Sequence, residues 1–557
     1  MNVITIMNDT FRRDHVGAYG LEAPWSNPGA GHGRIHTPNL DDLARQSVRF
    51  DRFYAGSYPT IPTRYDLWTG RFGFPTRPWQ PLERDDLTLA EILNSAGHPT
   101  MLIHDTPGLT AAGYNFQRGF MGWERVRGQH GDSWRTDPGQ LWLPCAPHKH
   151  KNHLGVRAYL RNVLDRRHEA EWMAGKSILA AMDWLERNAA HQDFYLYIDM
   201  WDPHEPFDAP PADQARYEAP DFDGDWLIYP AYGRGTYMTD DERAHVRASY
   251  AALCTYTDRW LGHLFEKLDA LGLADDTLVI WLTDHGHGLG DHDLQGKPGS
   301  QLGRLFDQNV RCPMFIRHPG GIGAGSSRGE VCQHVDIFAT VLDAFGMEPP
   351  SGIDGESLLP LITGESAWSR VTAFSGRFPP GLLTSGVIGG ADHDGFVGRE
   401  DLPEPLTVSN AQWQLIASPR GHVSELYDLE NDPDQLRNVV DEHPDEARRL
   451  QHQLLDFLET HRAPPELARA FEDQSTANPT VSPPLIAGPD AVLYAFTDAN
   501  GKTIAVESEA QAIEFAHGSP GASDVRRVRL RDLGPEGRNA HIGAHGQYYW
   551  PEDLLVS

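Results

Sequence analysis

The chain has 557 residues, which is too long for one ordinary domain and predicts one large core with one or two smaller units. No stretch approaches the ~20 apolar residues that a membrane span requires, so we expect no membrane partner. The formal net charge of −30 repels nucleic-acid backbones and anionic membrane surfaces, and argues against both. A small anionic substrate remains compatible with this charge, because a bound metal and a few local cations reverse the field inside one pocket.

The N-terminal stretch and the spacing of the cysteines indicate the same cellular compartment. The N-terminal stretch "MNVITIMNDT" enters a β-type run without the basic region, apolar stretch or cleavage site of a secretory signal. The four cysteines lie far apart and form no CxxC pair; they are Cys145, Cys254, Cys312 and Cys332. We therefore expect reduced thiols and a cytoplasmic location.

Short apolar runs alternate with helical patterns over about the first 370 residues. The predicted strands are Val3–Met7, Val48–Ser57, Thr100–Asp105, Phe194–Trp201, Thr277–Asp284 and Cys312–Pro319. The predicted helices are Leu87–His98, Ala170–Ala189, Asp240–Leu271 and His334–Gly346. This alternation predicts an α/β fold, with a mostly parallel sheet sandwiched by helices.

The texture of the sequence changes beyond about residue 375. We expect three parts: a catalytic domain over 1–375, a C-terminal α+β subdomain over 376–465, and a tail over 466–557. Within the second part, Asn410–Val439 reads as two short strands with a turn, and a helical pattern follows through Glu459. The second part is therefore predicted to contain a small antiparallel sheet and a helix.

Polar clusters follow five of the predicted strands. They are Asn8-Asp9, Ser57 to Arg64, His104-Asp105-Thr106, Asp202 to His204, and Asp284-His285. Ligands bind at the carboxyl ends of the strands in such sheets, so we expect these five clusters to form one pocket.

Six segments recur in the order found in sulfatases and in related phosphonate and phosphodiester hydrolases. These segments are "ITIMNDTFRRDHVGAYG", "TIPTRYDLWTGR", "DPHEPFDAPP", "TDHGHGLGDHDLQGK", "HVDIFATVLDAFG" and "ELYDLENDPDQLRN". The chain thus resembles the sulfatase family of the alkaline phosphatase superfamily over roughly residues 1–460. The resemblance implies an alkaline-phosphatase-like fold and the hydrolysis of an anionic ester.

The same resemblance implies a divalent metal ion, Mn²⁺, Zn²⁺, Mg²⁺ or Ca²⁺, held by Asp9, Asp284 and His285. Hard oxygen ligands with one imidazole suit such a cation, and Asn8 would be a neutral ligand where many sulfatases have a second aspartate. A helix cap is the alternative role for Asp9. One metal site is expected. The side chains that would orient other groups or, as an alternative, bind a second metal are His104, His287 and His292.

Thr60 occupies the nucleophile position of the family signature C/S-x-P-x-R, here "TIPTR". It is expected at a helix N-terminus, where free N–H groups favour anions, and Arg64 would orient it and hold an anionic oxygen. The alternative is that Thr60 only caps the helix while Arg64 forms a surface ion pair. Ser57 is a rival hydroxyl, but no arginine follows it at the right spacing.

Threonine changes the chemistry that this signature implies. Sulfatases of this type need formylglycine, which is made from Cys or Ser, and threonine cannot yield that aldehyde because its β-carbon carries a methyl group. A threonine alkoxide can still attack phosphorus, as in the superfamily's nucleotide pyrophosphatases/phosphodiesterases. Thr60 therefore favours phosphate over sulfate chemistry.

The remaining matched residues fit anion hydrolysis. His204 matches the histidine that acts on the leaving-group oxygen or on water, and Lys297 matches the lysine that contacts a substrate oxygen. Thr106 stands where many sulfatases have a Lys-Trp-His stretch, so one cationic contact is missing; Thr106 and His104 are predicted to bind substrate. A pocket with fewer cations suits a singly charged diester or phosphonate ester.

The leading hypothesis is a metal-dependent hydrolase that acts through a covalent phospho-threonine intermediate. Its substrates would be small phosphoesters, either phosphodiesters or phosphonate monoesters. A sulfuric-ester hydrolase and a catalytically silent binding protein are the alternatives. Silence is disfavoured because the chain retains the whole set of Asp9, Arg64, His204, Asp284, His285 and Lys297.

Three further segments have structural predictions. "CAPHKHKNH" (Cys145–His153) is expected to be a solvated loop, and the calcium-like block Asp428–Asn438 is expected to be a turn with capping side chains. The tail lies outside the resemblance, and related phosphonate hydrolases oligomerise through C-terminal segments. We expect it to cover the pocket mouth or a homo-oligomer interface, with Tyr548, Tyr549 and Trp550 as anchors.

Overall fold

The computed structural model of the protein describes most of the chain. The described residues are 1–22, 35–110, 113–139, 141–297, 299, 303–365, 368–377, 403–419, 424–472, 492–498, 503–506, 509–519, 521–529, 541–542 and 548–549. Within these ranges, no helix is both long and apolar enough to cross a lipid bilayer.

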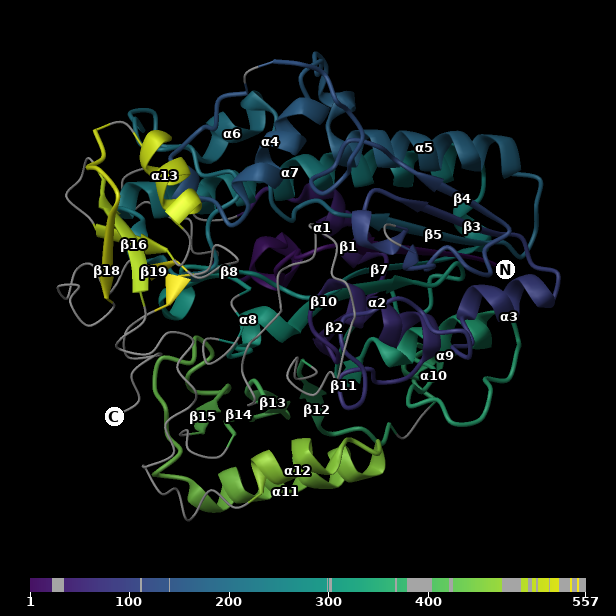
Figure 1. Ribbon diagram of the computed structural model, residues 1–557. Coiled ribbons are helices and arrows are strands. Elements are labelled where there is room, and N and C mark those ends of the chain that lie inside the picture. Colours follow the sequence, from purple (N-terminus) through teal and green to yellow (C-terminus); the bar gives the residue numbers. More distant parts are fainter. Residues whose placement is uncertain are drawn as a thin grey trace.

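An eight-stranded sheet forms the centre of the molecule, with the strand order β11-β2-β10-β7-β1-β5-β3-β4 (Figure 1). Its strands are β1 (Asn2–Asn8), β2 (Val48–Tyr54), β3 (Thr100–His104), β4 (Gly122–Arg125), β5 (Tyr195–Met200), β7 (Thr277–Thr283), β10 (Arg311–Arg317) and β11 (Ser327–Gln333). β10 pairs antiparallel with β2 and β7, whereas the other neighbours are parallel. The predicted mostly parallel sheet is confirmed.

Helices cover both faces of this sheet (Figure 1). On one face lie α5 (Met173–Asn188) and α7 (Asp240–Ala270), which pack with Ile4 and Ile6 of β1. On the other face lie α2 (Thr60–Thr69), α3 (Leu89–Ser95) and α9 (Val335–Ala344), in one cluster with Val3 and Met7. Alternate residues of β1 thus enter opposite cores, and the whole strand is buried, which explains its continuous apolar run. Further helices in this part of the chain are α1 (Pro38–Arg45), α4 (His153–Asn162), α6 (Pro211–Tyr217), α8 (Asp307–Val310) and α10 (Leu359–Thr363).

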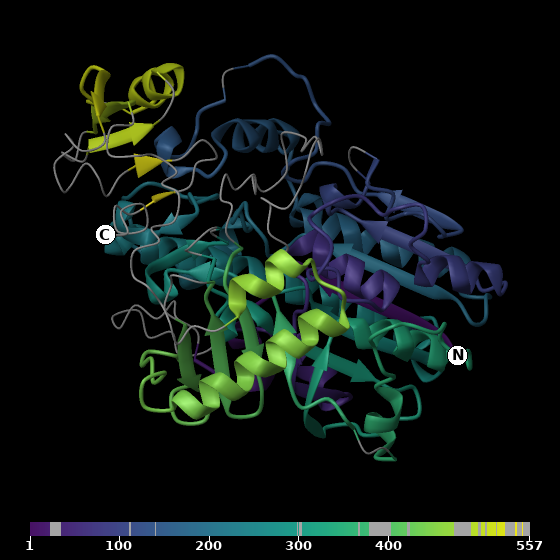
Figure 2. The same cartoon turned by 60° about the horizontal axis from the view of Figure 1, so that its bottom comes forward.

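A smaller antiparallel sheet follows in the chain (Figure 2). It consists of β12 (Ala373–Ser375), β13 (Leu406–Ser409), β14 (Trp413–Ala417) and β15 (Glu425–Asp428), with α11 (Pro444–Thr460) and α12 (Pro465–Phe471) packed beside it. This arrangement agrees with the predicted C-terminal α+β unit. In the calcium-like block, Asp428 Oδ1 accepts bonds from the backbone N–H groups of Glu430 (3.1 Å) and Asn431 (3.3 Å), as expected for a capped turn.

The tail contributes to a third sheet, coloured yellow in Figure 1 where the tail forms it. Its elements are β16 (Val492–Thr497), β17 (Thr503–Val506), α13 (Glu509–His517), β18 (Arg526–Arg529), β19 (His541–Ile542) and β20 (Tyr548–Tyr549). The strand order is β18-β16-β17-β19-β20-β6-β9-β8, so the sheet continues into β6 (Gly233–Arg234), β9 (Leu294–Gly296) and β8 (Gly288–Leu289). The backbone of Tyr548–Tyr549 therefore joins the catalytic part of the chain, whereas Trp550 lies outside the described residues.

Candidate active site

Thr60 is the first residue of α2 and is completely buried. Its hydroxyl lies 3.3 Å from Nε2 of His285, which follows β7. Arg64 lies one helical turn later and donates from Nη1 to the carbonyl of Thr60 at 3.2 Å. The predicted placement of Thr60 at a helix N-terminus is confirmed, and its hydroxyl faces an imidazole from the adjoining sheet.

Asp9, Asp284 and His285 meet at the ends of the paired parallel strands β1 and β7. They are fully buried, and each offers one ligand atom within 4.8 Å of the others. Nε2 of His285 lies 3.9 Å from Asp9 Oδ1 and 3.4 Å from Asp284 Oδ2. His285 Nδ1 bonds to the carbonyl of Gly286 at 2.8 Å, which turns the Nε2 lone pair toward the carboxylates.

The two carboxylate oxygens of Asp9 favour a cation at this site. Neither carboxylate oxygen of Asp9 has a hydrogen-bond partner in the described part of the chain. Burial and the neighbouring charge of Asp284 raise the pKa of Asp9 well above its ordinary value, and burial lowers the pKa of His285 to about 3. A neutral imidazole and a carboxylate that makes no hydrogen bond with the described residues fit a divalent cation, which would replace the proton that burial favours on Asp9.

Arg64 is buried among three carboxylates. Its Nε and Nη2 atoms lie 3.0 and 2.9 Å from the two oxygens of Asp199, and Nη1 contacts Asp284 and lies 3.2 Å from Asp9 Oδ2. The alternative of a surface ion pair is therefore wrong. Burial would lower the pKa of Arg64, but Asp199, Asp284 and Asp9 raise it well above its ordinary value, so it stays charged.

Asp199 was missing from the set expected from the sequence. It is the second-last residue of β5 and is completely buried. The signal was its place inside the apolar run "FYLYIDMW", because a carboxylate in a buried strand requires a charged or hydrogen-bonding partner.

Asn8 has a different set of contacts from the predicted one. Its amide oxygen accepts a hydrogen bond from Trp281 Nε1 at 2.8 Å, and its amide nitrogen donates to the carbonyl of Asp202 at 2.8 Å. Both ends of the amide thus tie β1 to its neighbours, and the role of Asn8 as a neutral metal ligand stays a prediction.

Thr106 and His104 support the site from β3 and the segment after it. The hydroxyl of Thr106 donates to Asp199, the carboxylate that holds Arg64. His104 Nδ1 lies 3.0 Å from the carbonyl of Thr106, and its Nε2 lies 3.5 Å from the hydroxyl of Thr110. Both predicted substrate-binding side chains are therefore engaged by the chain itself, next to Arg64.

His204 and Lys297 are brought together as the sequence predicts. Lys297 Nζ donates to His204 Nε2 at 2.7 Å, while His204 Nδ1 donates to the carbonyl of Glu205 at 2.8 Å. Burial, and then the charge of Lys297, lower the pKa of His204 well below its ordinary value, so the imidazole is neutral. Gly296 precedes Lys297 with φ +76°, and a Cβ at this position would lie 2.0 Å from the ring of Tyr232. Only glycine allows this approach.

The other two histidines considered for a second metal lie elsewhere. The ring of His292 stacks on Phe306 with centroids 3.7 Å apart. Nε2 of His287 lies 2.9 Å from Glu205 Oε1. Among the described residues, one group of three side chains with metal-ligating atoms forms, and the number of metal ions stays a prediction.

The prediction of a solvated loop for Cys145–His153 is wrong. His148, Lys149, His150 and Lys151 are all buried. The tail covers part of the segment, where the rings of His153 and Phe515 of α13 are 5.3 Å apart, and Lys149 bonds to Asp225 and Glu242 at 2.6 Å. Lys151 Nζ lies 4.1 Å from the ring centroid of Tyr232, close to the His204 pair. The cover by the tail was not predictable from the segment itself, because the tail lies far away in the chain.

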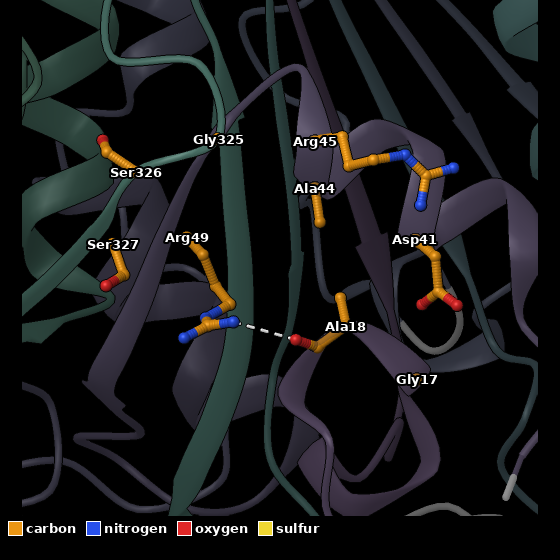
Figure 3. A pocket seen from close by; sticks show the side chains of 9 residues that line it. All are labelled: Gly17, Ala18, Asp41, Ala44, Arg45, Arg49, Gly325, Ser326 and Ser327. Carbon is orange, nitrogen blue, oxygen red and sulfur yellow. Dashed lines mark hydrogen bonds between the residues drawn. The ribbon is translucent and has the colours of Figure 1, made fainter.

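Two hollows differ in their relation to the site. A surface pocket of about 340 Å³ is lined by residues around Arg45 and Arg49, and none of the predicted site residues contributes to it (Figure 3). A narrower recess is lined by Tyr58, Lys297 and Arg377, among others. The guanidinium of Arg377 lies 4.6 Å from the ring centroid of Tyr58 and bonds to Glu404 at 2.6 Å. The recess, not the larger pocket, borders the candidate active site.

A mostly parallel sheet that brings together a buried Asp–Asp–His group and a hydroxyl at a helix N-terminus defines an α/β protein with a polar site at its strand ends. The sulfatase family model matches residues 1–347, and the chain belongs to the sulfatase family.

Proteins named for sulfate esters and proteins named for phosphonate esters are both similar to this chain. The multifunctional alkaline phosphatase superfamily protein PehA of Trinickia caryophylli is 28% identical, over 65% of this chain and 77% of its own length. Arylsulfatase K of Bos taurus is 24% identical, over 76% of this chain and 77% of its own. The phosphonate monoester hydrolase of Agrobacterium radiobacter has a similar fold, with a TM-score of 0.61 and 23% identity, over 83% of this chain and 96% of its own.

Proposed function

We propose that this sulfatase-family protein is a metal-dependent phosphoester hydrolase, with phosphodiesters or phosphonate monoesters as substrates and Thr60 as the nucleophile. The observation that carries the proposal is the position of the Thr60 hydroxyl, buried at the start of α2 and 3.3 Å from His285 Nε2. A divalent cation held by Asp9, Asp284 and His285 would lower the pKa of that hydroxyl and offset negative charge on the ester.

The chain's own residues account for both steps. In the first, Thr60 loses its hydroxyl proton to solvent and its oxygen forms a bond to phosphorus, while the bond to the leaving oxygen breaks and the His204–Lys297 pair supplies that leaving oxygen with a proton. In the second, water attacks phosphorus, the bond to Thr60 breaks, the Thr60 oxygen regains a proton from solvent, and the proton from water returns to the pair. The short contact of 2.7 Å between His204 and Lys297 supports such an exchange.

Mass spectrometry tests the intermediate directly. Protein quenched during turnover of a phosphodiester is expected to carry a phosphoryl group on the Thr60 peptide. Thr60→Ala should lose several orders of magnitude in turnover while metal stays bound, and Thr60→Ser should retain measurable activity, because it keeps the hydroxyl. Near-wild-type turnover by Thr60→Ala would favour direct attack by water and contradict the proposal.

A sulfuric-ester hydrolase is the second candidate, favoured by the similarity to arylsulfatase K. A panel of aryl sulfates, phosphate monoesters, diesters and phosphonates, assayed with metal-reconstituted protein, separates the two. Thr60 argues for phosphorus, since a threonine ester is cleaved by water whereas sulfate release in this family depends on formylglycine. If no substrate of any class is turned over, the result supports the alternative of a catalytically silent binding protein.

A further inference from the structure

Glu205 is a completely buried carboxylate beside the predicted acid–base histidine. Its Oε2 lies 3.1 Å from His204 Nδ1, and its Oε1 lies 2.9 Å from His287 Nε2. Its backbone carbonyl also accepts from His204 Nδ1 at 2.8 Å and from Trp201 Nε1 at 2.8 Å. The carboxylate therefore lies between two imidazoles, and only one of them has a role in the proposed reaction.

His287 is held mainly by packing and by this carboxylate. Its ring centroid lies 5.7 Å from that of Phe207 and 6.0 Å from that of Tyr232. The 2.9 Å contact to Glu205 has the distance of an ion pair but not the angles of a hydrogen bond. Tyr232 adds a contact of 3.4 Å from its hydroxyl to Glu205 Oε2. The carboxylate is thus fixed from several sides.

We propose that Glu205, supported by His287, is a positioning residue that keeps the His204 imidazole turned with Nε2 toward Lys297 and the reacting ester. The proposal rests on the proposed function only for the role of His204 in proton transfer. The Nδ1–H of His204 is donated to the backbone carbonyl of Glu205, and the carboxylate oxygen Oε2 lies 3.1 Å from the same nitrogen. An anionic oxygen at this place favours the tautomer with the proton on Nδ1 and the matching ring orientation. Without the carboxylate, the backbone bond alone holds the ring, which loses its alignment with Lys297.

The charges around His204 agree with this role. Burial alone would raise the pKa of Glu205, but His287 and Lys297 lower it below its ordinary value, so the carboxylate is ionised. The cationic or ionisable groups that face His204 are Lys297, His287 and Lys151, and each lowers the pKa of the imidazole. Glu205 is the anionic group against which His204 is oriented.

The test uses aryl esters that differ only in the acidity of the leaving phenol. Glu205→Leu is expected to lose about 10–100-fold in kcat with the least acidic phenol, with KM unchanged, because that oxygen needs a proton to depart. With the most acidic phenol the loss should be below about threefold. Glu205→Gln, which can keep an amide oxygen beside His204 Nδ1, should stay within about threefold of wild type throughout. His287→Leu should show the pattern of Glu205→Leu at smaller amplitude.

Asp258→Asn is the matched control, since this buried carboxyl accepts from the backbone of Leu40 at 2.7 Å and caps α1. It should not alter the dependence on the leaving group. An equal loss by Glu205→Leu across the series, or a Glu205→Gln variant as impaired as Glu205→Leu, would overturn the proposal.

The outcome is separable from that of the proposed function. The series is made as phosphate and as sulfate esters, because the demand for a proton belongs to the leaving oxygen whichever centre is attacked. A crystal structure of Glu205→Leu adds a readout without turnover: the 2.7 Å contact between His204 and Lys297 should be lost. If that contact persists unchanged, Glu205 does not position His204.

Discussion

At the scale of single residues, Asp9 carries the strongest signal for a metal. Asp9→Asn keeps the volume of the side chain but removes its charge from the group with Asp284 and His285. We expect metal affinity to fall at least about 10-fold and activity to fall with it, while the fold is retained. Elemental analysis after dialysis, together with circular dichroism, measures both. Stoichiometric metal in the dialysed variant would contradict the assignment.

The buried charge of Arg64 is compensated mainly by Asp199, which bonds to it through both carboxylate oxygens. Asp199→Ala leaves a buried guanidinium without its two-point partner, and we expect a loss of about 3–5 kcal/mol in the free energy of unfolding. The control is Asp183→Ala, which breaks an exposed pair with Arg187 on α5 and should cost less than about 1 kcal/mol. Thermal unfolding followed by fluorescence should therefore show a clearly larger shift for Asp199→Ala. Equal shifts would mean that the Arg64 contact is weak.

At the scale of elements, His334 connects α9 to the central sheet. It immediately precedes α9, and its Nε2 donates to the carbonyl of Thr283 at the end of β7 at 2.8 Å. Burial lowers the pKa of His334 to about 4, below the ordinary value of about 6.5 for the unfolded chain. The unfolded state thus binds the extra proton between these two values, so the wild type loses stability through this group as the pH falls from 6.5 to 4.

His334→Gln, which can still donate to Thr283, removes this titration. We expect the stability of the variant relative to wild type to improve as the pH falls from 7 to 4, by at most about 3 kcal/mol. Thermal midpoints measured at several pH values report it. His191→Gln, at an exposed histidine, provides the control for the same substitution at the surface. A pH-independent difference for His334→Gln would show that this imidazole is accessible to protons in the folded state.

The sequence was sufficient for most elements of the central sheet. Continuous apolar runs such as the one at β1 mark strands that are buried on both faces, and polar residues mark their ends. The direction of β10 was not predictable, because an apolar run reads the same in both directions and only the connection through α8 sets its orientation. The C-terminal sheet was predictable from its turns, whereas the joining of β20 to β6 depends on contacts between distant parts of the chain.

The positions of the candidate site residues were predictable from the sequence, but their hydrogen-bond partners were not. Strand ends located Asp9, Thr60 and Asp284 because topology brings such ends together. Hydrogen-bond partners were not predictable, and these assign Asn8 to Trp281 and Thr106 to Asp199. Periodicity and motifs give the position of a side chain, but its partner depends on packing that a sequence does not display.

At the scale of the whole molecule, the tail is expected to matter for activity. Removal of residues 466–557 would take β20 from β6 and uncover His148 and His153, which pack near Phe515. We expect the truncated protein to lose turnover or to change its oligomeric state, measured by kinetics and light scattering. Phe515→Ala is the milder variant and should weaken activity in the same direction. Unchanged kinetics and mass in the truncated protein would contradict this expectation.

The pairing of β20 with β6 also sets an order of events during biosynthesis. Lys297 directly follows β9. The sheet that contains β9 also contains β20 (Tyr548–Tyr549), which the ribosome translates about 250 residues later. The ribosome therefore releases Thr60, Arg64 and the metal-ligating residues long before this sheet has all of its strands. A nascent chain can fold the central sheet while the surroundings of Lys297 are still incomplete, so this part of the site is completed only after the residues near 548 have been translated.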